Sequence, residues 1–353
     1  MSELPTMRVS IVVACRNERN GVEDLVESIL SQDITEPWEA IIADGMSTDG
    51  TREILNEFST QNPSLRVIDN PEYIVSTGLN SAIKAARGEI IIRMDAHTKY
   101  APDYCRACVD VLEQTGADNV GGPARTRANT LLGRAISAAY HSRFSTGGAR
   151  FHDVDYRGWV DTVPYGCWRK ATLERFGLFD TSLVRNQDDE LNLRLVRAGA
   201  KIWQDPRIVS WYSPRANLSR LFYQYFQYGY WKVAVIRKHR LPASWRHLVP
   251  VLWLLVNSLL LLAMAVAKVT ASSKFFVLTS VLWACMALCY VCTSVAAAVW
   301  AGKDQWEILP YLPAVFATYH LSYGMGFTAG LFSFWKHSDR PSTASNIFTR
   351  ITR

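Results

Sequence analysis

The sequence predicts an α/β fold with a mostly parallel, Rossmann-like sheet flanked by helices, followed by an amphipathic interfacial helix and a C-terminal transmembrane helical anchor. Three observations support this prediction. Short apolar runs alternate with amphipathic segments over residues 9–94, as in buried parallel strands connected by helices. An aromatic-rich segment with interleaved Arg and Lys follows at 216–238. Beyond His247, long stretches contain almost no charge.

The first part of the chain shows the element order βαβαβαβ. The expected strands are 9–14, 39–43, 65–68 and 89–94, and the expected helices are 21–32, 51–58 and 77–87, the last closed by Gly88 as a C′ glycine. This order implies parallel strands joined by crossover helices. In such sheets ligands bind beyond the carboxyl ends of the strands. The residues that follow the strand ends are therefore the first candidates for a functional site.

The rest of the chain is expected to change from a soluble to a membrane character. Residues 118–214 indicate mixed strands and loops with one clear helix, 188–198, closed by Gly199. The expected division is an α/β domain at 1–215, amphipathic interfacial helices at 216–246, a membrane anchor at 247–335 and a tail at 336–353. The apolar stretches 248–267 and 275–301 are each long enough to cross ~30 Å of hydrocarbon. The stretch 308–335 contains prolines and glycines, so it is expected either to span or to re-enter.

The net charge and the cysteines limit which binding partners and which cellular compartment are expected. The formal net charge is +6, which suits an anionic membrane surface. Nucleic acid is not expected as a partner, because the one local cluster, 237–240, directly precedes an apolar span rather than forming a basic stripe. Two C-x-x-C pairs, Cys105 with Cys108 and Cys289 with Cys292, have zinc-site spacing, but the second lies in an apolar span and the first has no further pair to complete a site, so the seven cysteines indicate buried thiols in a reducing compartment. The N-terminus has no apolar core typical of a signal peptide, so the α/β domain is expected in the cytoplasm.

Polar residues after the first two strands are candidates for binding a nucleoside. They are Cys15, Arg16, Asn17 and Glu18 after the first strand, and Asp44 with Ser47 in the segment D-G-M-S-T-D-G-T after the second. A carboxylate at a strand end can accept hydrogen bonds from a base N–H or a ribose hydroxyl. The alternative is a turn in which Thr48 or Asp49 caps the next helix.

Two further motifs suit phosphate and proton chemistry. Asp95 and His97, two residues apart after the fourth strand, point to the same side and could share Mn²⁺ or Mg²⁺ beside a diphosphate. The alternative is a solvated loop. Asp188, in the run N-Q-D-D-E-L with Asp189, opens a helix and could act as a general base. Its alternative role is that of an N-cap or a partner of the helix dipole.

Taken together, these motifs resemble the family 2 glycosyltransferases. The motifs are C-R-N-E, D-G-x-S-T-D-G-T, G-L-N-x-A-I-K-x-A-x-G-E-I-I-x-R-x-D-A-H and D-D-E-L-x-x-R-L, in this order. The branch that the sequence resembles in particular is that of bacterial exopolysaccharide enzymes of the succinoglycan type. The resemblance covers residues 9–231 and implies a GT-A fold and an inverting mechanism.

The resemblance implies roles for individual residues. Glu18, Asp44, Asp95 and nearby Asn80 would contact the nucleotide, and Asp95 with His97 would hold the metal, His97 standing where the family usually has a second Asp. Asp188 would be the catalytic base. Residues on the acceptor or donor side would be Gly166, Arg169, Asp189, Gln224 and Trp231. Gln224 and Trp231 could instead anchor an aromatic-rich helix at the bilayer interface.

The expected reaction is transfer of one sugar from a UDP-sugar to a polyprenyl-diphosphate-linked saccharide at the bacterial inner membrane. Glucose is expected as the sugar from the resemblance alone. An alternative enzyme of the same fold would use polyprenyl phosphate itself as the acceptor. A nucleotide-dependent oxidoreductase is disfavoured, because the segment after the first strand offers a single glycine, Gly21, where G-x-G-x-x-G would be required. A non-catalytic membrane scaffold is disfavoured by the retained Asp44, Asp95 and Asp188.

Overall fold

The chain forms two compact units. The computed structural model describes residues 7–215, 217–242 and 244–336, and the units are Met1–Arg127 with Arg150–Ser213, and Ala128–Ala149 with Pro214–Arg353. The observed boundary after Ser213 lies close to the expected one at 215. The expected domain was continuous, however, whereas the structure assigns 128–149 to the second unit. The expected tail lies outside the described residues except for its first residue, Lys336.

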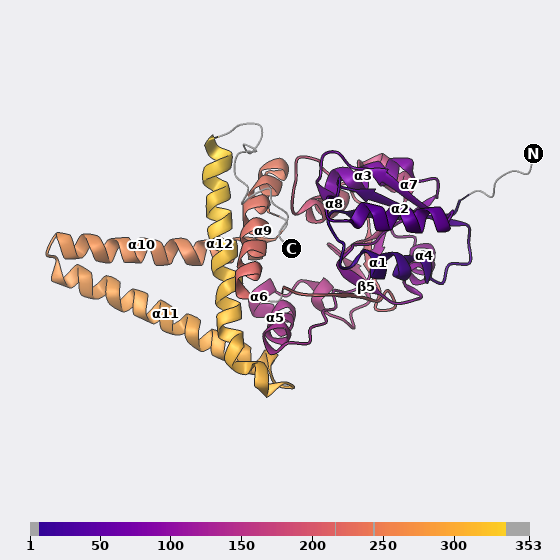
Figure 1. Cartoon of the computed structure of the whole chain (residues 1–353). Coiled ribbons are helices and arrows are strands. Elements are labelled where there is room, and N and C mark those ends of the chain that lie inside the picture. The colour runs from indigo at the N-terminus through magenta and orange to yellow at the C-terminus, as the bar shows by residue number, and fades with distance from the viewer. Residues whose placement is uncertain (1–6, 216, 243, 337–353) are drawn as a thin grey trace, which may run out of the picture. The chain divides into compact units, whose positions relative to one another are not determined.

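The first unit contains the predicted alternation of strands and helices (Figure 1). Its elements are β1 (Val9–Cys15), α1 (Val22–Leu30), β2 (Trp38–Asp44), α2 (Thr51–Gln61), β3 (Leu65–Asp69), α3 (Val75–Ala85), β4 (Ile90–Arg93), β5 (Thr98–Tyr100), α4 (Tyr104–Thr115), β6 (Asn119–Gly121), η1 (Arg150–His152), β7 (Gly158–Val160), β8 (Cys167–Arg169), α7 (Lys170–Phe176), α8 (Gln187–Arg197), β9 (Ile202–Gln204) and β10 (Ser210–Tyr212). All four predicted strands and the three helices between them are confirmed. So is the helix predicted at 188–198, which Gly199 follows in the left-handed region at φ 84°.

Within the described residues, eight strands form the main sheet in the order β3-β2-β1-β4-β8-β6-β9-β7. The strands β3, β2, β1 and β4 are mutually parallel, as predicted. The next strand, β8, is antiparallel to both β4 and β6. A shorter ribbon pairs β10 with β5. The carboxyl ends of β1, β2 and β4 therefore meet at one rim, and β8 begins at that rim.

Both faces of the sheet are covered, which explains why its central strands are apolar at most positions. Ile11 and Val13 of β1 pack in a cluster with residues of α1 and α4, whereas Val12 packs on the other side with residues of α3, α7 and α8. All three side chains are fully buried. A strand buried on both faces has no polar side to alternate with, so its sequence is a continuous apolar run.

The predicted role of Gly88 is wrong. Helix α3 ends at Ala85, and its C-cap, Ala86, has an extended backbone. Gly88 instead approaches β1 closely, because a Cβ atom there would lie 2.7 Å from the backbone nitrogen of Ser10. Its backbone N–H donates to the Ser10 hydroxyl over 2.9 Å. The glycine is therefore explained by contact with the strand and not by termination of the helix.

A buried glutamate stabilises the amino end of the sheet. Glu39 of β2 is fully buried and accepts hydrogen bonds from the Ser10 hydroxyl, the Arg87 backbone and side chain, and the Arg66 guanidinium. Burial alone would raise the pKa of Glu39, but the contacts with Arg87, Ser10 and Arg66 together hold it below its ordinary value. The ionised form of Glu39 therefore stabilises the fold at neutral pH.

The substitution Glu39→Gln is expected to lower the free energy of unfolding by about 3 kcal/mol, because it breaks a buried ion pair. A carboxyl whose pKa is lowered by folding stabilises the protein above its unfolded pKa, and this contribution is lost as pH falls through the folded value. Thermal unfolding of the full chain in detergent, followed between pH 7 and pH 3, should show a weaker acid dependence for the variant. The matched control is Glu57→Gln, an exposed glutamate of α2. Equal melting temperatures for both variants would contradict the prediction.

The second unit is helical. It contains α5 (Leu131–His141), α6 (Arg143–Thr146), α9 (Leu218–His239), η2 (Trp245–Leu248), α10 (Val249–Val269), α11 (Ser273–Ala301), η3 (Trp306–Tyr311) and α12 (Leu312–Lys336). The prediction of a single clear helix within 118–214 is wrong, because α5, α6 and α7 also form there. The hydroxyl of Thr130 caps α5 by accepting from the Gly133 N–H, a local signal that was readable from the sequence.

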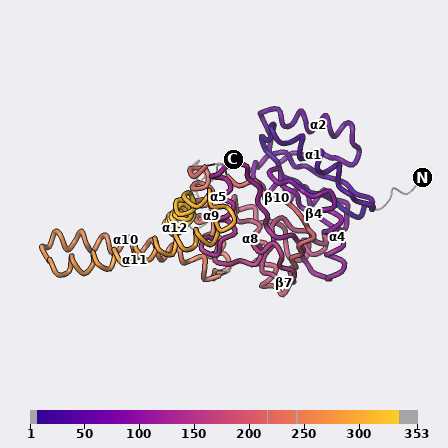
Figure 2. The backbone as a smooth tube through the Cα atoms, turned by 90° about the horizontal axis from the view of Figure 1, so that it is seen from below, coloured from indigo at the N-terminus to yellow at the C-terminus, as the bar shows by residue number. Residues whose placement is uncertain are grey.

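Two helices of the second unit are long and apolar enough to cross a membrane. They are α10 with the preceding turn, Trp245–Val269, and α11, Ser273–Ala301, and only 6% of the most apolar window of each is buried. Figures 1 and 2 show them side by side as a hairpin. These helices correspond to the spans predicted at 248–267 and 275–301.

The third apolar stretch differs from the two spans. Residues 306–311 form η3, and α12 crosses the base of the α10–α11 hairpin instead of running alongside it (Figures 1 and 2). Its His320 imidazole makes a hydrogen bond of 2.9 Å to the Tyr290 hydroxyl of α11, and Gly324 lies against the Pro250 carbonyl of α10. Along its length α12 packs on α9, the helix predicted to be interfacial. Within the described residues, α12 therefore does not form a third span parallel to the other two.

Candidate active site at the carboxyl rim of the sheet

The loops after β1 and β2 are joined by hydrogen bonds. The Asn17 backbone N–H donates to the Ser47 hydroxyl over 2.7 Å, and the Thr48 N–H donates to the Asn17 side-chain oxygen over 2.8 Å. The Glu18 N–H donates to the Thr51 hydroxyl over 2.7 Å. The predicted nucleoside-binding segments therefore form a single connected surface at the rim.

Asp44 lies at the end of β2 and is almost fully buried. Its carboxylate accepts from the Ser47 hydroxyl and backbone N–H and is 3.2 Å from the Arg52 guanidinium. This network orders the turn after β2. The alternative prediction for this segment was also a turn before the next helix. Neither Thr48 nor Asp49 is the N-cap of α2, which is Gly50 with no side-chain capping hydrogen bond, but the Asp49 carboxylate accepts from the Thr51 backbone N–H and hydroxyl. The segment is thus a structured turn, and contact of Asp44 with a nucleoside remains a prediction.

The backbone at the rim is strained. Five non-glycine residues here have φ between 52° and 64°, in the left-handed region. Three of them follow strands β1, β2 and β3, and two precede β8 and α8. They are Asn17, Met46, Tyr73, Tyr165 and Asn186. The left-handed region costs a non-glycine residue about 1–3 kcal/mol. Strain of this kind persists where the surrounding structure holds it and is concentrated at functional sites. Its position supports the rim as the site.

Glu18 connects the loop after β1 with the segment after β4. Its carboxylate lies 3.2 Å from Nε2 of His97. Asp95 is two residues earlier in the chain, and the His97 backbone N–H donates to its carboxylate over 3.2 Å. The Asp95 backbone N–H in turn donates to the Tyr100 hydroxyl over 2.6 Å. The structure thus brings Glu18, Asp95 and His97 together.

Arg93, the last residue of β4, connects Asp95 to Asp188. Its guanidinium forms an ion pair with the Asp188 carboxylate and lies 3.5 Å from the Asp95 carboxylate. Burial alone would lower the pKa of Arg93, but the two carboxylates hold it above its ordinary value, so the group stays charged. Arg93 was not predicted from the sequence to be a site residue. The Asp44, Asp95 and Asp188 regions therefore lie along one rim, linked through Ser47, Asn17, Glu18 and Arg93.

Asp188 lies in the first turn of α8 and is partly accessible, with 37% of its side chain exposed. Burial of the remainder raises the pKa of Asp188 above its ordinary value, and the Arg93 charge opposes this shift. The N-cap of α8 is Asn186, whose side chain makes no capping hydrogen bond. Asp188 is therefore not the N-cap, and its exposed edge could accept a proton from a bound molecule.

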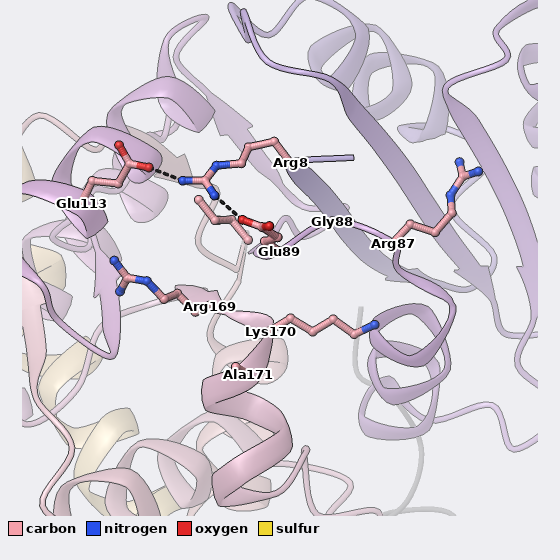
Figure 3. A pocket seen from close by; sticks show the side chains of 9 residues that line it. Arg8, Arg87, Gly88, Glu89, Glu113, Arg169, Lys170 and Ala171 are labelled. Carbon is pink, nitrogen blue, oxygen red and sulfur yellow. Dashed lines mark hydrogen bonds and ion pairs between the residues drawn. The ribbon is translucent and has the colours of Figure 1, made fainter. Parts of the chain in front are cut away.

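Two other predicted residues, Gly166 and Arg169, lie at opposite ends of the sheet. Gly166 lies at the rim, where its carbonyl accepts from the Arg93 backbone N–H over 3.1 Å. Arg169 is paired with Ile90 and lies at the opposite, amino end of the sheet, beside a small pocket that Arg8, Glu89 and Lys170 also line (Figure 3). The grouping of Arg169 with the rim residues is wrong, because β8 runs away from the rim.

Asn80 and the two aromatic-helix candidates have clear structural contacts. Both polar groups of the Asn80 side chain bond to the Phe179 backbone, over 2.8 and 3.0 Å. Gln224 and Trp231 belong to α9 in the second unit. The Trp231 side chain is buried, with its ring 6.2 Å from that of Phe334. Their contact with a donor remains a prediction, as does that of Asp189.

One further residue at the rim, Tyr73, was missed from the sequence, and it contacts the predicted residue Arg16. Arg16 lies over the Tyr73 ring, with its Cζ 4.5 Å from the ring centroid. The Tyr73 side chain is exposed, and its backbone is left-handed at φ 64°. The signal in the sequence was weak, because an exposed tyrosine after a short strand is common. This pair provides a flat surface beside the loops that hold Asn17 and Asp44.

The residues fit a metal ion only as an open site. Asp95 and His97 offer an oxygen and a nitrogen donor with 32% and 41% of their side chains exposed. Among the residues that the structure describes, no group of three or more His, Cys, Asp or Glu side chains is arranged to hold a metal ion. An ion held here would therefore need ligands from a bound diphosphate or from water.

Comparisons with known proteins agree with this geometry. The model of the family described as "Glycosyl transferase family 2" matches residues 10–169. The succinoglycan biosynthesis protein ExoA of Rhizobium meliloti (strain 1021) is 32% identical over 336 residues, which cover 94% of this chain and 97% of that protein. The dolichyl N-acetyl-alpha-D-glucosaminyl phosphate 3-beta-D-2,3-diacetamido-2,3-dideoxy-beta-D-glucuronosyltransferase of Methanococcus voltae is 27% identical, over 67% of this chain and 76% of that protein.

A solved structure supports the assignment of the fold. The mannosyltransferase PcManGT from Pyrobaculum calidifontis, solved with GDP-Man and Mn²⁺, superposes with a TM-score of 0.58 at 19% identity, over 94% of this chain and 90% of that one. At this identity the similarity concerns the fold alone, which is GT-A as predicted. The family model and the relative that spans nearly the whole chain identify the activity. The chain belongs to glycosyltransferase family 2 and is a glycosyltransferase of exopolysaccharide or glycan biosynthesis.

Proposed function

We propose that the protein is an inverting enzyme that transfers one sugar from a UDP-sugar to a polyprenyl-diphosphate-linked saccharide. The observation that supports this proposal is the Asp95–Arg93–Asp188 arrangement, in which two carboxylates contact one buried cation. We assign Asp95 to the phosphate side and Asp188 to the acceptor side. The acceptor hydroxyl oxygen attacks the anomeric carbon, the bond from that carbon to the diphosphate breaks, and UDP leaves. Asp188 takes the hydroxyl proton, and an α-linked donor gives a β-linkage.

The donor would lie along the rim. Cys15, Arg16, Asn17, Glu18, Asp44 and Ser47 would surround the nucleoside, and the joined loops after β1 and β2 support this placement. Asp95 and His97 would hold Mn²⁺ or Mg²⁺, which supplies positive charge to the departing diphosphate. The Asp95 backbone N–H donates to the Tyr100 hydroxyl, which fixes the backbone that carries this carboxylate.

A lipid-linked saccharide is the proposed acceptor. The hairpin α10–α11 supports a membrane location, in which the catalytic unit lies in the cytoplasm at the bacterial inner membrane. The name of the Methanococcus voltae relative describes an acceptor sugar linked to dolichyl phosphate, which favours a lipid-linked saccharide over polyprenyl phosphate itself. Glucose is the first donor sugar to test, since one relative acts in succinoglycan biosynthesis.

The test of the acceptor is a donor screen with membranes that contain the protein. Radioactive UDP-sugars, UDP-glucose first, are added, and the lipid extract is separated by chromatography. The proposal expects label in a lipid whose saccharide is one sugar longer than in membranes without the protein. Label in a polyprenyl monophosphate sugar would instead identify the lipid phosphate as acceptor. Absence of transfer from every UDP-sugar would overturn the proposal.

Removal of divalent cations is expected to abolish transfer. With only Asp95 and His97 as protein ligands, an ion in this open site should exchange readily, so EDTA should reduce the initial rate at least about 100-fold. Added Mn²⁺ or Mg²⁺ in excess should restore it. Transfer that continues at the original rate in EDTA would remove the metal assignment while leaving Asp188 as the base.

A further inference from the structure

Arg93 is a charged residue at a position where the strand is otherwise apolar. It follows Ile90, Ile91 and Ile92, all buried, and only 4% of its own side chain is exposed. A buried guanidinium is stable only when its charge is paired and its N–H groups are bonded. Both partners are carboxylates of the proposed reaction, Asp188 and Asp95. The contact with Asp188 joins segments 95 residues apart in the sequence.

Aromatic rings fix the guanidinium in place. Its Cζ lies 5.7 Å from the ring centroid of Phe179 and 6.0 Å from that of Tyr165, distances at which a cation is attracted to the ring face. The Tyr165 hydroxyl is hydrogen-bonded to Thr98, and the Gly166 carbonyl accepts from the Arg93 backbone. The side chain is therefore held from its backbone to its charged end, and its position is set by the fold.

We propose that Arg93 is a positioning residue for the transfer reaction, in which one guanidinium sets the separation between Asp95 on the diphosphate side and Asp188 on the acceptor side. This inference rests on the proposed function. A guanidinium suits the task because its planar fork can bond two carboxylates at fixed angles, whereas an ammonium acts as a single point of charge. A misplacement of about 1 Å between reacting groups can cost about 100-fold in rate.

The proposal separates two measurements that a merely structural role would change together. Arg93 is a permanent cation next to Asp95, so it repels a divalent ion that binds there. Its removal should lower turnover, because the two carboxylates lose their common partner. The same removal should tighten the binding of Mn²⁺, because the repulsion disappears. General disorder at the rim would weaken both turnover and metal binding.

The experiment uses the full chain in detergent with Arg93→Met and Arg93→Lys. The matched controls are Arg66→Met and Arg66→Lys, since Arg66 also pairs with a buried carboxylate, that of Glu39, at the opposite end of the sheet. Turnover is measured as labelled lipid product, and Mn²⁺ binding as the loss of the free Mn²⁺ spin-resonance signal in the presence of UDP. In Arg93→Met, kcat should fall about 100-fold and the Kd for Mn²⁺ should decrease at least about threefold. Arg93→Lys should retain more activity, about one-tenth of the original.

Three results would overturn the proposal. One is a kcat within about threefold of wild type in both Arg93 variants. Another is Mn²⁺ binding that weakens in step with turnover in a variant that melts at the wild-type temperature. The third is equal loss in the Arg66 controls. Arg93→Lys keeps the charge and most of the volume, so it decides the question if Arg93→Met does not fold. A wild-type protein that transfers no sugar would overturn the proposed function as well, whereas an active wild type with unaffected Arg93 variants overturns this inference alone.

Discussion

Replacement of Asp188 by Asn is expected to reduce kcat for sugar transfer by about 10²–10⁴-fold, the range expected for loss of a general base. The amide keeps the shape of the side chain but cannot accept the acceptor proton. Donor binding should change little, because the proposed nucleoside contacts come from Asp44 and the loops after β1 and β2, whereas Asp188 belongs to α8. The measurement is the initial rate of lipid labelling at saturating donor, together with the Kd for UDP.

The control for this variant is Glu174→Gln, which neutralises an exposed carboxylate of α7 and should leave transfer unchanged. Glu174→Gln should melt at the wild-type temperature, whereas Asp188→Asn removes one partner of the buried Arg93 guanidinium and should melt at a lower temperature, so turnover is compared well below both melting temperatures. Normal turnover of Asp188→Asn would eliminate Asp188 as the base and revive the non-catalytic scaffold as an interpretation.

The pH dependence of kcat provides an independent measurement on the same residue. A base works only when deprotonated, and partial burial raises the pKa of Asp188 while Arg93 opposes the shift. Activity should therefore be lost, as pH falls, at a higher pH than an exposed aspartate would give, and should be constant above that range until another group titrates. This acidic limb should be absent from the residual activity of Asp188→Asn.

Much of the first unit could be predicted because its signals are local. The strands β1, β2 and β4 are buried on both faces, so their sequences are apolar at nearly every position, and their carboxyl ends meet at one rim by topology alone. The positions of Asp44, Asp95 and Asp188 follow from strand ends and a helix start. The excursion at 128–149 could not be predicted in this way, because its partners lie in a distant part of the chain.

Arg93 and Arg169 show where reasoning from the sequence fails. In the sequence, Arg93 is only a charged residue at the end of an apolar strand. Its proposed role depends on the ion pair with Asp188, which is brought close to Arg93 only when the chain folds. Arg169 was grouped with Gly166 because both belong to one motif. The direction of β8 was not visible in the sequence, and an extended segment of three residues covers about 10 Å, enough to move from one end of a short strand to the other.

In the second unit, the substitution Gly326→Ala is expected to destabilise the protein by about 3 kcal/mol. Gly326 of α12 faces α9, and a Cβ atom there would lie 1.9 Å from the Phe226 carbonyl oxygen. The obstacle is backbone, so no side chain can rotate away. Gly229 of α9 meets the Tyr323 carbonyl in the same manner, and Gly330 meets that of Tyr230. Small residues four apart allow two helices to approach closely, and this contact depends on them.

The sign of this effect distinguishes a collision from an ordinary change of helix propensity. Alanine stabilises the interior of an isolated helix relative to glycine by about 1 kcal/mol, so a loss of stability in Gly326→Ala must come from the contact with α9. The neighbouring Met325 is exposed, and Met325→Ala should melt at the wild-type temperature. Thermal unfolding of the full chain in detergent, read as loss of the monodisperse peak in size-exclusion chromatography, compares the two variants. If Gly326→Ala melts at or above the wild-type temperature, the close approach of α9 and α12 is not what holds these helices together, and the crossing of α12 over the hairpin loses its physical basis.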